Sequence, residues 1–343
     1  MARNDNTAAE LSKMVYSGAT PWHGCGVKVD SDMSWRDIPK LDPIGYSARQ
    51  LRPMQTIGFD QSGGLVMLDV PKAKAVVRVA DNKVLATVGD RYSLDGFQPL
   101  DTIERMATLA DAAGATVETA GFLRDGNLQW AQATVPGLEF EVPIGCRDRP
   151  ASVLREKLTM FNSFDGSTPF IAGGAATDIV CQNTFMHALH EVAKDGKRMF
   201  KIKHTRNGQV NLDAMMQELD AMRQGFASFA EMAHKLAETR MSTADFIEFA
   251  ESLIPDPVDA SPTRAQNKRA MLLDAWQDAP GQRLDGKRNT AWGALSAVTF
   301  FTSWQAPVKG DDAAASRWYN ATLGDGADLA DAAVQKLTVW AGA

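Results

Sequence analysis

Apolar and polar residues alternate along much of the chain between residues 46 and 135, and this period of two predicts β-strands. Three such segments, 46–58, 64–71 and 74–94, follow one another, and the letters ADNKV in the third predict the turn of a hairpin. The segment 116–135 alternates on both sides of the letters RDGN, which predict a second hairpin. We therefore expect antiparallel hairpins in this part of the chain.

Helical spacing interrupts this alternation and later replaces it. Apolar residues recur every three or four positions within residues 94–115, which predicts a helix between the hairpins. Two further strands are expected around the letters DGST, followed by a helix near Cys181. Beyond residue 209 the period is 3.6, with breaks rich in proline, glycine and aspartate. The helices predicted there are 212–238, 243–254, 263–278, 289–304 and 327–340.

These periods predict an α+β protein, in which N-terminal antiparallel β-hairpins packed on helices are followed by an all-helical C-terminal part. The first 45 residues follow neither period and carry two tryptophans among glycines and prolines. We predict three parts, namely an N-terminal arm over residues 1–45, an α+β core over 46–208 and a helical region over 209–343.

The composition is that of a folded protein in a reducing compartment. Of the 343 residues, 45% are apolar and 23% are charged, and no apolar run approaches the roughly 20 residues that a membrane helix needs. The N-terminal residues have no apolar signal-peptide core, so we expect no export. Cys25, Cys146 and Cys181 form no CxxC pair, which argues against a disulfide framework. We expect a cytoplasmic protein with no membrane partner.

Positive charge is concentrated in one segment of an otherwise acidic chain. The net charge is −6, yet residues 147–206 contain ten Lys or Arg against six Asp or Glu, so this segment carries +4 and the remainder −10. Such asymmetry is compatible with a local anion-binding surface. A solvated surface that happens to be basic explains the same composition.

The end of this basic segment has the pattern of a strand. Within residues 194–206, Lys201 and Lys203 fall on one side, and Ile202 and His204 fall on the other. A row of lysines above a buried face is able to follow a phosphate backbone. The alternative is an edge strand whose lysines prevent aggregation. The pattern alone leaves both interpretations open.

Candidate catalytic and metal sites are incomplete. His23 stands beside Cys25 in PWHGCG, but a metal needs three or four ligands and a nucleophile needs an oriented base. Gly173 and Gly174 precede a predicted helix without the lysine of a P-loop or the spacing of a dinucleotide site. We predict that the protein is not an enzyme and uses no cofactor and no metal. Catalysis through Cys25 and His23, or through Asp325 in LGDGAD, is a third hypothesis.

Six motifs occur along the chain in a characteristic order, and they read TPWHGCG, VGDRYSL, TDIVCQNT, KHTRN, NTAWGALSAVT and LGDGADLADAAVQKL. In their order and approximate spacing, they resemble the phage/plasmid-like family of unknown function that is found on mobile elements. This resemblance covers residues 15 to 340, almost the whole chain. It implies a habitat on a phage or plasmid, and it implies no chemistry.

The order of predicted hairpins, helices and strands also resembles the core of the single-strand annealing recombinases, the superfamily of phage lambda's beta protein. Members of that superfamily form rings or filaments that hold single-stranded DNA in a positively charged groove and pair it with its complement without ATP. The resemblance implies that this protein binds and anneals single-stranded DNA, with the 46–208 core as the binding part, during phage or plasmid recombination.

The residues expected to line the groove come from charge and position, because no residue-level motif of the recombinases aligns with this chain. The expected partners are single-stranded DNA, further copies of the same chain and other recombination proteins of the same element. The groove residues are Arg147, Arg149, Arg155, Lys157, Lys197, Arg198, Lys201, Lys203 and Arg206.

A second functional class stays open at this point. Four tryptophans lie on predicted C-terminal helices and, if exposed, would give a structural or host-interaction protein a surface for another protein. Tryptophans at helical spacing are more often packed inside. These residues are Trp276, Trp292, Trp304 and Trp318.

Overall fold

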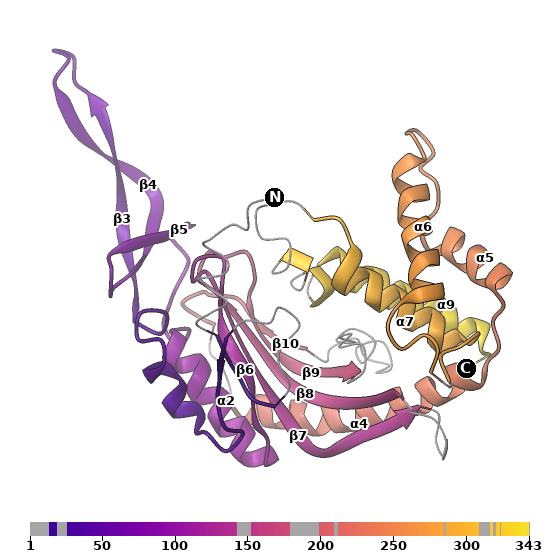
Figure 1. Ribbon diagram of the computed structural model, residues 1–343. Helices are drawn as coiled ribbons and strands as arrows, with labels where there is room; N and C mark the ends of the chain where they lie inside the picture. The colour runs from indigo at the N-terminus through magenta and orange to yellow at the C-terminus, as the bar shows by residue number, and fades with distance from the viewer. Residues whose placement is uncertain are drawn as a thin grey trace. The chain divides into compact units, whose positions relative to one another are not determined.

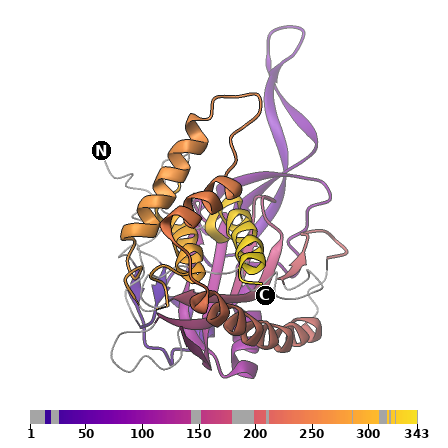
Figure 2. The same ribbon diagram turned by 90° about the vertical axis from the view of Figure 1, so that its right-hand side faces the viewer.

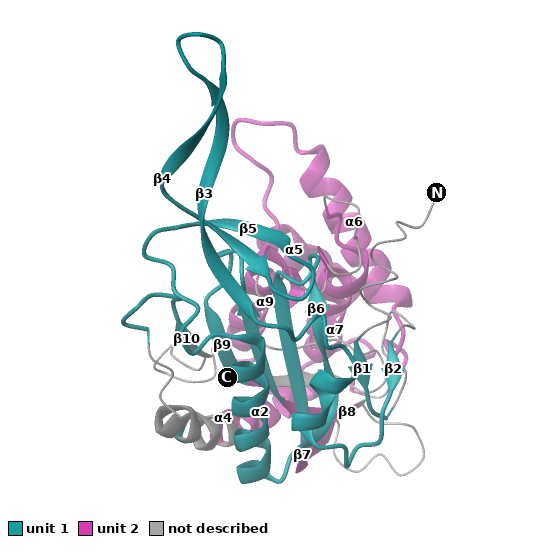
Figure 3. Cartoon of the chain, turned by 90° about the vertical axis from the view of Figure 1, so that its left-hand side faces the viewer, with its two compact units in different colours: residues 1–134, 158–173, 199–218 teal, residues 135–157, 174–198, 219–343 magenta. Residues whose placement is uncertain are grey.

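The computed structural model confirms the α+β class and divides the chain into two compact units (Figure 3). Unit 1 comprises residues 1–134, 158–173 and 199–218, and unit 2 comprises 135–157, 174–198 and 219–343. The predicted division into an N-terminal arm, an α+β core and a helical region stays a prediction. The residues that the structure describes are 14–18, 26–142, 152–178, 199–208, 212–284, 286–308, 316–317, 320–322 and 324–342.

A seven-stranded sheet contains the second predicted hairpin and the strands around DGST. Its order is β10-β9-β8-β7-β6-β1-β2 (Figure 1). The hairpin of β6 and β7 turns at RDGN as predicted, since Leu123 pairs with Leu128. The strands are β1 (Val15–Tyr16), β2 (Val27–Lys28), β6 (Thr116–Leu123), β7 (Leu128–Val142), β8 (Ser152–Ser163), β9 (Phe170–Asp178) and β10 (Met199–Ile202).

Helix α2 (Pro99–Ala113) forms where the 3.6-residue spacing predicted it. The carboxylate of Asp101 accepts a hydrogen bond from the backbone N–H of Gln98 at the first turn, and Gly114 ends the helix at φ 64°, a left-handed conformation that suits glycine. Its apolar face, including Ile103 and Met106, is buried. In the part of the N-terminal arm that is described, residues Trp35–Lys40 form a 3₁₀ helix, η1.

Three strands form a separate antiparallel sheet, β3 (Arg49–Phe59), β4 (Leu65–Arg78) and β5 (Lys83–Gly89). The sequence predicted two separate segments here, 64–71 and 74–94, whereas β4 continues through Pro71 to Arg78. A bulge explains how, because the register jumps between Pro53 and Gln55 and leaves residues 70–73, opposite Met54, without partners on β3. The hairpin of β3 and β4 extends well away from α2 and β6 of the same unit (Figure 1).

The base of this hairpin is fixed by a buried arginine. Arg49 pairs with Arg78 in the ladder, and only 2% of Arg49 is exposed. Its guanidinium donates to the carbonyls of Gly45 at 2.8 Å and Ser47 at 2.5 Å, and it lies 4.9 Å from the ring centre of Phe164. Burial lowers the pKa of Arg49 to about 10, which leaves the group protonated at neutral pH.

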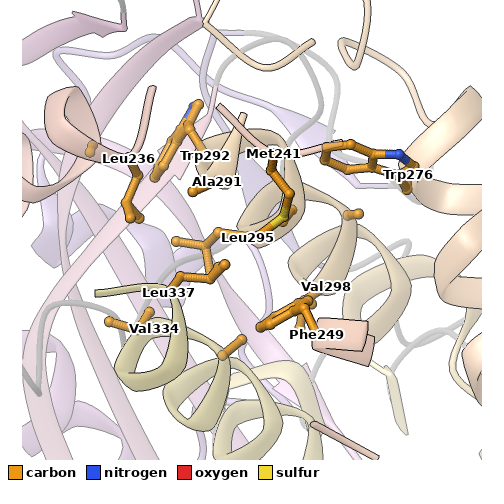
Figure 4. Close-up of a cluster of buried hydrophobic side chains, with 14 of the residues drawn as sticks. Leu236, Met241, Phe249, Trp276, Ala291, Trp292, Leu295, Val298, Val334 and Leu337 are labelled. Atoms are coloured by element: carbon orange, nitrogen blue, oxygen red, sulfur yellow. The ribbon is translucent and has the colours of Figure 1, made fainter. Parts of the chain in front are cut away.

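Unit 2 is mostly helical, as predicted. Its apolar core includes Trp276 and the fully buried Trp292 (Figure 4). The ring of Trp276 stacks on that of Phe246, with centres 4.6 Å apart. This burial confirms that these two tryptophans are packing residues. No helix in the described ranges is long and apolar enough to cross a membrane. The helices, several of them orange to yellow in Figure 2, are α4 (Leu212–Glu238), α5 (Thr243–Leu253), α6 (Thr263–Asp278), α7 (Ala291–Phe300), the π-helix η2 (Phe301–Gln305) and α9 (Asp325–Trp340).

Candidate nucleic-acid interface

The basic strand predicted from the sequence is β10, which lies at one end of the seven-stranded sheet. It pairs antiparallel with β9, where Lys201 lies opposite Ile171. Lys201 and Lys203 are exposed, Ile202 is half-buried and His204 is buried. Burial therefore alternates from Lys201 to His204 as predicted, although the strand itself ends at Ile202, so Lys201 lies on β10 and Lys203 directly follows it.

A buried hydrogen-bond network holds the end of β10 in place. The amide nitrogen of Asn162 on β8 donates to the carbonyl of Phe97 at 2.9 Å and to the hydroxyl of Thr102 on α2 at 3.0 Å. The amide oxygen of Asn162 is therefore left to accept from Nε2 of His204, 2.7 Å away. Asn162 thus joins three segments that are distant in the sequence.

Aromatic packing reinforces this network. The ring of Tyr92 stacks on His204 with centres 5.2 Å apart and an interplanar angle of 12°. Its hydroxyl donates to the carbonyl of Ser163 at 3.0 Å, and the N–H of Ser93 donates to the carbonyl of His204 at 3.1 Å. The motifs VGDRYSL and KHTRN, which are far apart in the sequence, therefore meet, since Tyr92 also forms a β-bridge with Thr205.

The environment of His204 keeps its imidazole neutral. The pKa of His204 is lowered from 6.5 to about 4, chiefly by burial; the carboxylate of Asp165 opposes this change and the charge of Arg105 adds to it. At neutral pH, His204 therefore acts as a hydrogen-bond donor and an aromatic surface. It supplies no positive charge to the lysines of β10.

This pKa predicts a loss of stability in mild acid. His204 binds a proton near pH 6.5 in the unfolded chain and only near pH 4 in the folded chain. Its contribution to the free energy of unfolding is therefore complete above pH 6.5 and is lost as the pH falls towards 4. Between pH 7 and pH 5 we expect a loss of about 2 kcal/mol in the free energy of unfolding. Urea unfolding at both pH values measures it. In the variant His204→Gln, the loss of stability between pH 7 and pH 5 should be smaller by the same amount. An unchanged loss would show that His204 is not its cause.

The other predicted groove residues are spread over the chain. Arg206 is exposed beyond β10, close in sequence to the two lysines. Arg155 and Lys157 are half-buried on β8, within unit 2, and Arg155 forms an ion pair with Glu139 on β7 at 2.8 Å. This pairing satisfies much of the charge of Arg155. The predicted residues that lie outside the described part of the chain are Arg147, Arg149, Lys197 and Arg198.

The glycine pair has a structural explanation. Gly173 and Gly174 lie inside β9, and Gly173 is paired with Met199 of β10. The pair is therefore in the middle of a sheet and does not open a helix, so the geometry of a phosphate-binding helix start is missing there. His23, Cys25 and Cys181 lie outside the described residues. Within the described ranges, no group of three potential ligands is arranged to hold a metal ion.

Comparison with protein families matches residues 84–323 to the model described as a domain of unknown function, DUF932. The chain belongs to the DUF932 family. The matched DUF932 region starts within β5 and contains Tyr92, Asn162 and β10, whereas β3 and β4 precede it. The searches of curated proteins and of solved structures found no match. The resemblance to annealing recombinases stays a prediction.

Proposed function

We propose that the protein binds the backbone of single-stranded DNA along β10 and, as an oligomeric ring or filament, anneals strands during phage or plasmid recombination in the cytoplasm. The observation that carries this proposal is the exposure of Lys201 on β10 and of Lys203 just after it, directly before His204, whose buried side chain is hydrogen-bonded to Asn162. Binding and annealing of this kind require no catalytic residue and no ATP. Other recombination proteins of the same element are further proposed partners.

The geometry of β10 suits a repeating polyanion. Lys201 on β10 and Lys203, two residues further along, are both exposed and present two neighbouring cations. Arg206, also exposed, adds a third cation just beyond them. Since His204 is anchored to Asn162, the backbone between these cations is held in one conformation. Binding therefore orders mainly the side chains, which keeps its entropic cost low.

Two other readings have less support. Lysines on an edge strand also prevent aggregation, which explains their exposure without any ligand. A surface for protein partners built from the tryptophan-bearing helices is disfavoured, because Trp276 and Trp292 are buried in the core of unit 2. Weak binding of DNA by a single copy is enough for the proposed function, since an oligomer binds one DNA strand at many sites at once.

The double variant Lys201→Glu/Lys203→Glu tests the proposal. We expect its affinity for a fluorescent single-stranded oligonucleotide at low salt to fall by about tenfold or more. The slope of log affinity against log salt should become shallower by about 1.4, because each single-strand phosphate contact contributes about 0.7. Fluorescence anisotropy across a salt series measures both quantities.

A matched control separates a local effect from one of net charge. Arg264→Glu/Lys336→Glu makes the same charge change at exposed positions of α6 and α9, and it should leave the affinity unchanged. Absence of binding by the folded wild type at low salt would overturn the proposal, and so would equal losses in both double variants. Binding without acceleration of annealing would limit the function to DNA binding.

A further inference from the structure

The hairpin of β3 and β4 has an apolar face that nothing in the described chain covers. Residues 54–70 form its outer part, which we call the distal ribbon. In the ladder Ile57 pairs with Met67 and Phe59 pairs with Leu65, so these four side chains share one face. Their exposures are 65% for Ile57, 62% for Met67, 73% for Phe59 and 70% for Leu65. Four large apolar side chains thus lie together in water.

An isolated ribbon of this kind is poorly stabilised by itself. Two strands without a third or a packed face are marginally stable in water. Strand β5 pairs with β4 only from Ala73 to Arg78, so among the described strands the distal ribbon has none beside it. The bulge, Pro71 and Lys72, which limit unwanted pairing, lie at the inner end of the ribbon. Between Gln55 and Asp69 the strands contain no lysine and no proline.

The charges of the ribbon bear on how two copies align. Within the ribbon Asp60 lies in the turn at the tip, and Asp69, paired with Gln55, lies at the inner end of the apolar face, whereas Arg52 and Lys72, both exposed, lie just beyond it. When two identical ribbons are placed antiparallel, the tip of each lies towards Asp69, Lys72 and Arg52 of the other, a mixture of both signs. A parallel arrangement brings Asp60 against Asp60 and Asp69 against Asp69. The antiparallel arrangement is therefore the less repulsive one, and the apolar face supplies the attraction.

We propose that two copies of this chain associate through their distal ribbons, apolar face against apolar face and antiparallel, about an axis near the pair Ile57 and Met67. The four side chains of each copy remove on the order of 400–500 Å² from water, or about 1,000 Å² for the pair, which is the size of a weak, reversible interface. This inference rests on the proposed function in one respect, since it names the surface that joins the subunits of the oligomer proposed there.

Self-association is measured on the full chain without DNA, so its failure is distinguishable from a failure of DNA binding. Sedimentation velocity over a range of micromolar concentrations should show the wild type at twice 37.2 kDa or more. The variant Phe59→Ser/Leu65→Ser should sediment as the monomer. Both positions are exposed, so the far-ultraviolet circular dichroism and the thermal midpoint should stay as in the wild type.

Two further variants sharpen the result. Val258→Ser removes an apolar side chain that is 95% exposed elsewhere, in a loop of unit 2, and should leave the dimer intact. Arg52→Glu/Lys72→Glu places acidic residues towards Asp60 of the other copy and should weaken association by about tenfold or more. A monomeric wild type would overturn the inference. This holds also if the monomer binds lipid vesicles through the ribbon. Dimers that survive Phe59→Ser/Leu65→Ser would overturn it as well.

Discussion

The variant Asn162→Ala is expected to lose about 4 kcal/mol in the free energy of unfolding, because its side chain serves three buried partners at once. Without the amide, Nε2 of His204, the carbonyl of Phe97 and the hydroxyl of Thr102 lose a hydrogen bond in the interior. Each buried polar group left in this state costs about 1–3 kcal/mol. The expected sum is a large part of the stability of a typical domain.

The same substitution should also affect the candidate interface. His204 holds the end of β10, so we expect faster amide hydrogen exchange over residues 199–208 and weaker binding of single-stranded DNA. Urea unfolding followed by circular dichroism measures the loss of stability. Asn207→Ala, at an exposed position in the same segment, is the matched control and should change little. A loss below about 1 kcal/mol in Asn162→Ala would show that the network is not an anchor.

The second large effect is expected in unit 2, where Gly293→Ala should destabilise the protein by at least about 3 kcal/mol. A Cβ atom at Gly293 would lie 1.9 Å from the backbone carbonyl oxygen of Lys287. The carbonyl of Gly293 also accepts a hydrogen bond from the side chain of Gln282 at 2.9 Å. Because the obstacle is backbone, α7 has to shift, and this shift disturbs the fully buried Trp292 beside it.

A glycine in open space provides the comparison. A Cβ at Gly89, at the end of β5, meets nothing within 4 Å, so Gly89→Ala should leave the stability within about 0.5 kcal/mol of the wild type. Differential scanning calorimetry of both variants compares their thermal midpoints. Equal midpoints for the two variants would contradict the close packing of α7.

Local patterns were enough to predict most of the elements. The helical period predicted 212–238 and 263–278, which are the bounds of α4 and α6, because an amphipathic helix carries its signal within its own sequence. The course of β4 through Pro71 was not predictable in this way. A proline usually ends a strand, and the bulge that admits it depends on the partner strand.

The candidate site was predictable only in part, for the same physical reason. The alternation of Lys201 and Lys203 with buried positions is local, and the sequence showed it. The contact between Tyr92 and His204 joins residues that are 112 positions apart, and a single sequence gives no signal for such a pairing. The ion pair of Arg155 with Glu139 likewise depends on which strands are neighbours. Charge counting alone therefore does not show which basic side chains are already engaged in ion pairs within the protein.

The pairing of Arg49 with Arg78 has an evolutionary consequence. Arg49 and Arg78 are paired, so the segment between them begins and ends at the same place in unit 1. It can be regarded as one long excursion of the chain. Insertions or deletions made in matched pairs along β3 and β4 would lengthen or shorten the ribbon by about 3.4 Å per residue pair and leave the body unchanged. Related chains would thus be free to vary the ribbon faster than the part that holds β10.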